Sequence, residues 1–269
     1  MSPIRQHSKI AIVALVAAAA VLLFVFWPRA DDPEAPIERH PLALMTSLPI
    51  YWPEGADIAS IVGGAGEQPW VRTVIERRYE LVPLDSLSAA ADGESGPLNG
   101  FDRLLLAQPR GLSPADNEAL DSWVRGGGRL LYLLDPMLTG QYSVPVGDPR
   151  HPTLVGLVPP VILRWGLAMQ YLDQQPFDLH EASYGDGLLP VQLAGDILIL
   201  DEADGFSEEQ LAARGSCEVL GEGLAARCKV EKGQVLVVAD AAVLEMFEPT
   251  GETQQQLLDL LDVAFEVSN

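Results

Sequence analysis

The sequence lacks the signature motifs of the best-known catalytic sites. It contains no GxSxG elbow of the serine hydrolases, no HExxH zinc motif and no GxxxxGK[ST] phosphate-binding loop. Its histidines are few and scattered, without metal-ligand spacing: His7, His40, His151 and His180. These absences predict no metal site, no cofactor and no catalytic residue, and they favour a protein that is not an enzyme.

Basic residues are also scarce. The chain has 17 Lys and Arg against 38 Asp and Glu among its 269 residues, and its formal net charge is −21. Residues 1–30 contain three of the basic residues and none of the acidic ones, so the rest of the chain carries 14 basic and 38 acidic residues, a net charge of −24. A surface this acidic repels phosphate groups, which argues against a nucleic-acid partner.

Three consecutive glycines, Gly126–Gly128, have the wrong neighbours for a phosphate-binding loop. Such a loop follows a strand and opens a helix, whereas here the helix comes first. Ser113 is placed to cap a helix over 113–125, with Pro114 at its first position and Gly126 as the left-handed residue past its end. The glycines are therefore predicted to end a helix and turn the chain into a strand.

The longest hydrophobic run is at the N-terminus, where Ile10–Trp27 are 18 uncharged, mostly apolar residues. As a helix they would span roughly 27 Å, which is enough to cross a thin bilayer. Arg5 and Lys9 precede the run, so the positive-inside rule keeps the N-terminus in the cytoplasm. A cleaved signal peptide is the alternative, although the small-residue cleavage motif is poor; both interpretations export the remainder of the chain.

The predicted organisation is thus a single-pass inner-membrane protein with its body outside the cytoplasm. Residues 1–9 form a cytoplasmic tail, 10–27 the transmembrane anchor and 28–41, rich in proline and charge, a linker. Residues 42–269 form the exported, periplasmic domain. The membrane, contacted through Ile10–Trp27, is the first predicted partner.

Cysteine is nearly absent: only Cys217 and Cys228 occur, in SCEVLGEGLAARCKV. The GEG centre favours a turn between two short strands, and pairing Leu220 with Ala225 around it sets the two cysteines opposite each other. Directly opposed residues of an antiparallel pair are close enough to bridge when they occupy a non-hydrogen-bonded position, and exported proteins meet oxidising conditions. We predict a Cys217–Cys228 disulfide in a β-hairpin near 215–230, inserted between the central sheet and the final strand.

Hydrophobic runs and helical patterns alternate along the body. Strands are predicted at 42–49, 79–84, 102–109, 129–136 and 233–240, and helices at 69–78, 113–125 and 253–267. Segment 160–173 has the pattern of a short helix that turns at Gly166 into a strand, and 188–200 that of one or two strands. This alternation predicts an α/β fold, namely a mostly parallel sheet with helices on both faces, flavodoxin-like and preceded by the transmembrane helix.

Ligands of open α/β sheets bind outside the carboxyl ends of the strands. Polar and aromatic residues at those predicted ends are the ligand-binding candidates: Thr46, Ser47, Tyr51, Trp52, Gln108, Arg110, Asp135 and Asp240. They would form a polar crevice with an aromatic wall. A structural role is the alternative for both aspartates, since Asp135 precedes Pro136 in a turn and Asp240 is placed to cap a following helix.

Two parts of the chain carry a family resemblance: FDRLLLAQP with LSPADNEALDSWVRGGGRLLYLLDP, and later KGQVLVVADAAVLE. They resemble the GldG-type auxiliary components of ABC transport systems and related domains of unknown function, whose fold is similar to class I glutamine amidotransferases. The resemblance covers Pro41–Pro136 and Gly233–Val267. It implies a membrane-anchored, exported domain that works beside an ABC transporter permease and ATPase, and it implies no known reaction. Where amidotransferases place a nucleophilic cysteine this chain has Asp135 and Pro136, so no glutaminase activity is expected.

Two functions from different classes follow. The first is a non-catalytic binding or scaffold domain, tethered to the membrane and auxiliary to an ABC transport system. The second is an exported hydrolase or carbohydrate-acting enzyme that uses carboxylates at the sheet's carboxyl edge, such as Asp135 and Asp240. The missing nucleophile favours the first function, whereas two carboxylates with raised pKa values projecting into one cleft would favour the second.

Overall fold

A computed structural model describes residues 39–56, 67–89, 96–201, 204–205, 207–208, 210 and 213–265. The predicted cytoplasmic tail, the predicted anchor Ile10–Trp27 and the predicted linker up to residue 38 lie outside these residues. Within the described ranges, no helix combines the length and the apolar character needed to cross a membrane.

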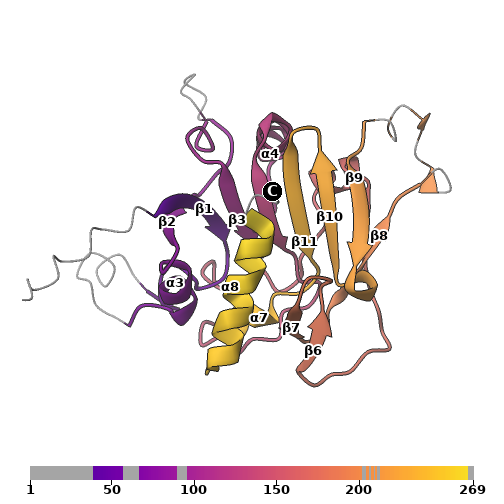
Figure 1. Cartoon of the computed structure of the whole chain (residues 1–269). Coiled ribbons are helices and arrows are strands. Elements are labelled where there is room, and N and C mark those ends of the chain that lie inside the picture. Colours follow the sequence, from indigo (N-terminus) through magenta and orange to yellow (C-terminus); the bar gives the residue numbers. More distant parts are fainter. Residues whose placement is uncertain are drawn as a thin grey trace, which may run out of the picture. The chain divides into compact units, whose positions relative to one another are not determined.

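A seven-stranded sheet forms the centre of the described chain (Figure 1). Its strands lie in the order β2 (Tyr79–Pro83), β1 (His40–Thr46), β3 (Arg103–Ala107), β4 (Arg129–Leu133), β11 (Gly233–Val238), β10 (Ala225–Val230) and β9 (Ser216–Leu220). The first five strands are parallel, and β10 is antiparallel to both of its neighbours. The predicted α/β fold with a mostly parallel sheet is therefore confirmed. The first strand starts two residues inside the predicted linker, because His40 and Pro41 already pair with β2.

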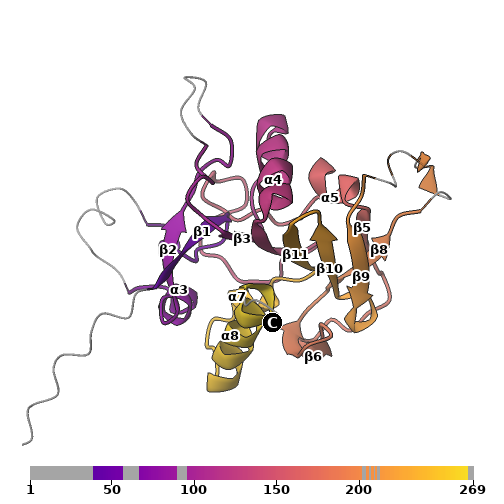
Figure 2. The ribbon, with the colours of Figure 1, turned by 45° about the horizontal axis from the view of Figure 1, so that its top comes forward.

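Helices cover both faces of this sheet, as predicted, and Figure 2 shows them on its two sides. They divide between the faces as follows: α3 (Trp70–Ile75), α7 (Ala242–Glu245) and α8 (Gly251–Phe265) on one, α4 (Pro114–Gly126) and α5 (Pro160–Arg164) on the other. Side chains alternate along each strand, so Leu42 and Leu44 belong to the core under α3 and α8, and Ala43 belongs to the core under α4. Each fully buried leucine stabilises the fold by roughly 1.5–3 kcal/mol relative to exposure.

The helix before the triple glycine is capped as the sequence predicts. Ser113 Oγ accepts the N–H of Asp116 at 3.1 Å, and the Asp116 carboxylate accepts the N–H of Ser113 at 3.2 Å. The left-handed residue is Gly127 (φ 123°), one position later than predicted, because Gly126 still has a helical conformation. The glycines end α4 and lead into β4, so their predicted role is confirmed.

The hairpin β9–β10 has the predicted register. Leu220 pairs with Ala225 and Cys217 with Cys228, and the two cysteines form the predicted disulfide, with Cα atoms 4.1 Å apart. The predicted place of the hairpin is wrong: β11 pairs directly with β4, and the hairpin extends the sheet beyond β11. The physical reason is burial, since β11 is almost entirely buried and needs a neighbour on each side, whereas β9 is largely exposed and suits an edge.

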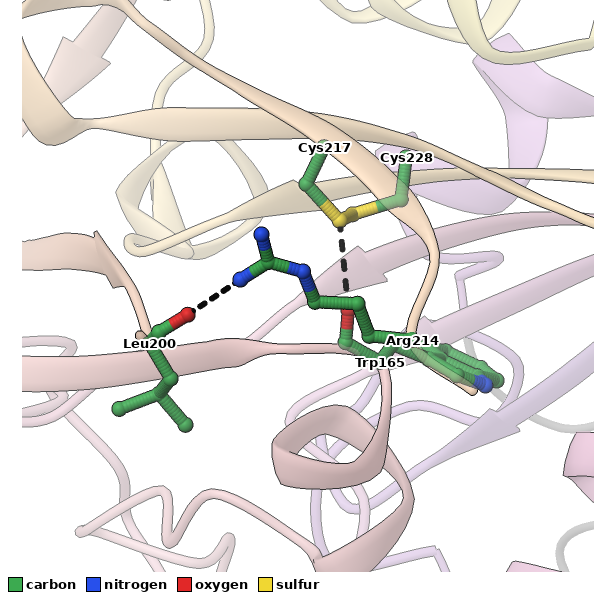
Figure 3. Close-up of a disulfide and its surroundings, with 5 residues drawn as sticks. All are labelled: Trp165, Leu200, Arg214, Cys217 and Cys228. Carbon is green, nitrogen blue, oxygen red and sulfur yellow. Dashed lines mark hydrogen bonds between the residues drawn. A yellow bond between two sulfur atoms is a disulfide. The ribbon is translucent and has the colours of Figure 1, made fainter. Parts of the chain in front are cut away.

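Figure 3 shows what surrounds the disulfide. The Sγ of Cys217 lies 3.5 Å from the carbonyl oxygen of Trp165, a residue with no exposed surface. Arg214, just before β9, donates from Nη1 to the carbonyl oxygen of Leu200 at 2.5 Å. Cys228 belongs to the core on the α4 side. The bridge thus ties an edge strand to a buried strand.

Removal of the disulfide should lower the free energy of unfolding by roughly 2–3 kcal/mol, the chain-entropy value for so short a loop. Urea denaturation of the oxidised and reduced wild-type protein measures the effect of the bridge alone. The Cys217→Ser, Cys228→Ser double variant should be no more stable than the reduced protein, because a serine hydroxyl at the buried position 228 must be desolvated. Equal stability of the oxidised and reduced protein would contradict the prediction.

Two small antiparallel sheets accompany the main one: β5 (Leu167–Tyr171) with β8 (Gly195–Ile199), and β6 (His180–Ser183) with β7 (Leu188–Val191). As predicted, α5 turns at Gly166 (φ 93°) into a strand, and the segment 188–200 contains two strands. β6 is not predicted from the sequence, because HEAS is short, polar and mostly exposed.

Candidate functional site

The carboxyl ends of the parallel strands meet at one edge of the sheet, where hydrogen bonds join the predicted polar residues. Ser47, after β1, donates from its backbone N and its Oγ to the carbonyl oxygen of Gln108, at 3.2 and 2.6 Å. Gln108, after β3, bonds in turn to the backbone of Asp135, after β4. Asp135 accepts the N–H of Ala241, next to Asp240 at the end of β11. These residues form one continuous layer across the strand ends.

The side chain of Gln108 joins two backbone segments within this layer. Its side chain has no exposed surface: Nε2 donates to the carbonyl oxygens of Asp135 at 3.0 Å and Thr153 at 2.8 Å, and Oε1 accepts the Asp135 N–H at 2.9 Å. Its φ of 43° lies in the left-handed region, which costs a non-glycine residue about 1–2 kcal/mol. The three bonds to buried backbone groups offset that cost, so the polar atoms of this side chain serve the fold.

Residues 149–156 cross the strand ends as a strap, a name we keep below. Arg110 holds its beginning by donating from Nη2 to the carbonyl oxygen of Pro149 at 2.5 Å. The hydroxyl of Ser47 accepts the N–H of Thr153 at 2.9 Å in its middle. Two of the predicted ligand contacts, Ser47 and Arg110, thus fasten the strap.

The end of the strap lies directly on the layer beneath it. Gly156 donates its N–H to the carbonyl oxygen of Asp135 at 2.7 Å. A Cβ at Gly156 would come within 2.6 Å of that oxygen and 3.0 Å of Gln108 Oε1, so only glycine fits this approach. The strap therefore covers the ends of β3 and β4.

Asp135 is a carboxylate without exposed surface. It accepts the N–H groups of Met137 at 2.7 Å and Ala241 at 3.0 Å, one on each oxygen. Burial raises its pKa to about 7, aided by the charge of Glu245 and opposed by the two N–H bonds. The predicted turn role agrees with the bond to Met137, and the bond to Ala241 adds a tie between the ends of β4 and β11.

Asp240 has the same character one strand away. Only 2% of its surface is exposed, and it accepts the N–H groups of Gln192 at 3.0 Å and Ala242 at 2.6 Å. Burial and the charge of Asp135 raise its pKa well above the ordinary value. Both aspartates thus have raised pKa values, but their oxygens accept backbone N–H groups, and neither residue is part of the lining of an open cleft.

Sequence reasoning missed Glu245 and Tyr142. Tyr142 donates its hydroxyl to Glu245, whose carboxylate also accepts the N–H groups of Thr139 at 3.3 Å and Gly140 at 3.0 Å. Burial and the charge of Glu245 raise the pKa of Tyr142, which stays a neutral phenol. No motif marks these residues, because more than 100 positions separate them in the chain.

An accessible cleft of about 250 Å³ lies at the ends of β1 and β2. Its polar and aromatic lining consists of Thr46, Ser47, Tyr51, Trp52, Glu54, Asp85, Arg110 and Arg150. The aromatic wall is held in place: the Arg72 guanidinium lies 3.9 Å from the Tyr51 ring centre, and the Trp52 ring stands edge-on to Tyr51 at 4.7 Å. Trp52 remains 44% exposed. On the floor, the Thr46 hydroxyl donates to the carbonyl oxygen of Ala107 at 2.6 Å.

Metal ligands do not converge in the part of the chain that the structure describes, where no group of three or more His, Cys, Asp or Glu side chains could hold an ion. His40 begins β1, and His180 begins β6. His151 is buried in the strap with its ring 5.3 Å from that of Tyr142, and its Nδ1 lies 2.8 Å from the carbonyl oxygen of Pro152.

No family model matches the chain, and no curated protein matches its sequence. Among solved structures, the exo-β-1,4-mannosidase Op5Man5 from Opitutaceae bacterium strain TAV5 is 13% identical with a TM-score of 0.45, over 86% of this chain and 37% of that one. A β-galactosidase from Bacillus circulans sp. alkalophilus is 14% identical with a TM-score of 0.43, over 83% and 31%. The mmIFT52 N-terminal domain is 11% identical with a TM-score of 0.49, over 85% and 99%. This chain thus spans about a third of the length of the two glycosidases, and so distant a likeness carries no statement about activity.

Proposed function

We propose that this chain is an exported, membrane-tethered binding domain, auxiliary to an ABC transport system, with its ligand in the cleft beside Trp52. The proposal rests on a difference between two groups of residues at the carboxyl edge of the sheet. Gln108, Asp135 and Asp240 direct their polar atoms at buried backbone groups, whereas Tyr51 and Trp52 wall an accessible cleft. A preformed aromatic wall with a few polar groups around it is typical of small-ligand sites.

The family part of the proposal is a GldG-type component with a fold similar to class I glutamine amidotransferases. The strand order β2-β1-β3-β4-β11 supports it, because it matches the flavodoxin-like order 2-1-3-4-5, whose ligand crevice lies outside the carboxyl ends of the strands where the order reverses. Here that reversal is at β1, beside the cleft. Recovery of a permease and an ATPase with the detergent-solubilised full chain would test the transporter link.

Export and anchoring through Ile10–Trp27 also belong to the proposal. The disulfide supports export, because structural disulfides form and persist in oxidising compartments. A reporter that is active only outside the cytoplasm, fused after Asn269, tests this part. Activity confined to the cytoplasm would contradict export, and a mature N-terminus near residue 30 would replace the anchor with a signal peptide.

Trp52→Ala should weaken ligand binding about five- to thirtyfold, since a lost aromatic contact is worth on the order of 1–2 kcal/mol. A thermal-shift screen of sugars, amino acids and small carboxylates identifies a ligand, and titration calorimetry then measures its affinity. Phe177→Ala is the matched control, because Phe177 is 73% exposed and lies outside the cleft lining. A ligand of the wild type that binds Trp52→Ala with equal affinity would contradict the site.

A hydrolase or carbohydrate-acting enzyme is the second candidate, and one observation favours it. Two carboxylates, Glu54 and Asp85, line the same cleft and would replace Asp135 and Asp240 as acid and base. Turnover of a glycoside or an ester that is lost in both Glu54→Gln and Asp85→Asn would establish this function. Ligand binding without turnover would support the binding domain.

A further inference from the structure

A second cavity lies beside the cleft, between α7, the segment 139–143 and the residues that flank β6 and β7. Its volume is about 670 Å³. The side chains that give it its chemical character are Glu54, Tyr142, Leu179, Gln192, Glu245 and Phe247. It is large enough for a small organic molecule.

The charge on the walls of this cavity has one sign. Glu54 and Glu245 contribute carboxylates, and within the described residues no Arg, Lys or His is part of the lining. Both carboxylates are fixed, Glu54 by the N–H of Val144 at 2.9 Å and Glu245 by its bonds to the segment 139–142. A cavity with walls of one sign concentrates its field and attracts the opposite charge.

The buried aspartates lie within electrostatic reach of these carboxylates. The charge of Glu245 acts on both Asp135 and Asp240, and the charges of Asp135 and Glu54 act on Tyr142. All four carboxyl groups therefore lie within electrostatic range of the cavity walls. A cation placed there would relieve their mutual repulsion.

Aromatic and apolar groups supply the rest of the wall. Tyr142 is kept neutral and contributes an uncharged aromatic ring to the lining, and Phe247, also part of the lining, is 94% exposed. Leu179 and Met246 continue this apolar surface. Aromatic faces beside carboxylates suit an alkylated ammonium group, which is attracted by both and is easily desolvated.

We propose that this cavity binds a small organic cation, namely an amine or a quaternary ammonium compound. A bare metal ion fits less well, because in the described part of the chain no three acidic, histidine or cysteine side chains converge on one point. This site shares Glu54 with the cleft beside Trp52, but its other lining residues are different, and it does not depend on the transporter link.

The test compares choline with 3,3-dimethylbutan-1-ol, its neutral isostere, by titration calorimetry on the purified full chain. Choline should bind at least about tenfold more tightly than the isostere, because only the charged compound interacts with the carboxylates and the π faces. Equal affinity of the two compounds, or no binding of choline at millimolar concentrations, would overturn the proposal.

Variants then locate the site. Glu54→Gln keeps an acceptor for the Val144 N–H but loses the charge, and Phe247→Ala removes an almost fully exposed ring, so neither variant should unfold the protein. Each should weaken choline binding about two- to fivefold, the loss expected for one exposed cation–π contact or one screened charge. Glu80→Gln, an exposed charge on β2, is the matched control, and Trp52→Ala separates this cavity from the neighbouring cleft. Wild-type affinity in Phe247→Ala, or an equal loss in Trp52→Ala, would place the cation elsewhere.

Discussion

Asp135→Asn is expected to reduce the pH dependence of stability near neutral pH. Burial and the charge of Glu245 place the pKa of Asp135 at about 7, against an ordinary value of 3.8. Folding therefore favours the protonated form. Protonated Asp135 makes its full contribution to the free energy of unfolding below about pH 4. That contribution is lost as the pH rises through 7, which lowers the free energy of unfolding by about 4 kcal/mol.

Asparagine cannot titrate, so the variant should lack this change. At pH 5 it should be less stable than the wild type by about 1–3 kcal/mol, because its amide offers one acceptor oxygen to the N–H groups of Met137 and Ala241, of which the second is buried. Between pH 5 and pH 8 the wild type should lose about 3 kcal/mol relative to the variant. Urea denaturation at unit intervals of pH measures the difference.

The comparison of the two proteins reports on Asp135 together with its effect on Asp240, because the charge of Asp135 helps to raise the pKa of Asp240 and every other residue is the same in both. Asp85→Asn, an exposed carboxylate at the same edge, is the control and should follow the wild type at every pH. If the free energies of unfolding of Asp135→Asn and the wild type changed in parallel with pH, position 135 would not couple folding to pH.

Gly156→Ala should lower the free energy of unfolding by about 2–3 kcal/mol through overpacking at the strap. The new methyl group would lie 2.6 Å from the carbonyl oxygen of Asp135 and 2.7 Å from Leu134 Cδ1. Neither can move away easily, because Asp135 is held by the Gln108 amide and Leu134 is buried in the core. For a domain of this size, that loss lowers the melting temperature by about 5–10 °C.

Gly126→Ala provides the matched control for that experiment. Gly126 is the last residue of α4, and no atom would lie within 4 Å of its Cβ, so alanine there should stabilise the protein by about 0.5–1 kcal/mol. If Gly156→Ala had the melting temperature of the wild type, the strap could move away from the strand ends without loss of stability, and the prediction would be wrong.

Most of the sheet and its helices could be predicted from the pattern of apolar residues. The buried strands are continuous apolar runs bounded by glycine or polar residues, and α4 has a complete cap in Ser113 and Asp116. The short strand β6 was not predicted, because its four residues, three of them polar and exposed, carry no periodic signal. The position of the cysteine hairpin was also wrong, since pairing between strands far apart in sequence depends on which faces need burial.

The candidate site was predictable only as a set of strand ends. The rule that parallel strands present their carboxyl ends at one edge brought Ser47, Gln108 and Asp135 together correctly. It could not separate the residues that support the fold from those that face solvent. The contacts of Asp135 with the strap and with Ala241 decide which of these residues are covered. Those partners lie about 20 and 106 positions from Asp135 along the chain.

The amino-acid order alone thus decides the features that involve near neighbours: the cap of α4, the turn at the glycines, and the register that joins Cys217 to Cys228 over 11 positions. The energies of such features depend on backbone preference and spacing within one or two turns of chain. The folded chain decides the features that need distant partners, namely the burial of Asp135 and Asp240, the contact of Tyr142 with Glu245, and the two cavities. Desolvation and charge act through space, so their effect on a side chain is settled only when the whole sheet and its covering segments are in place.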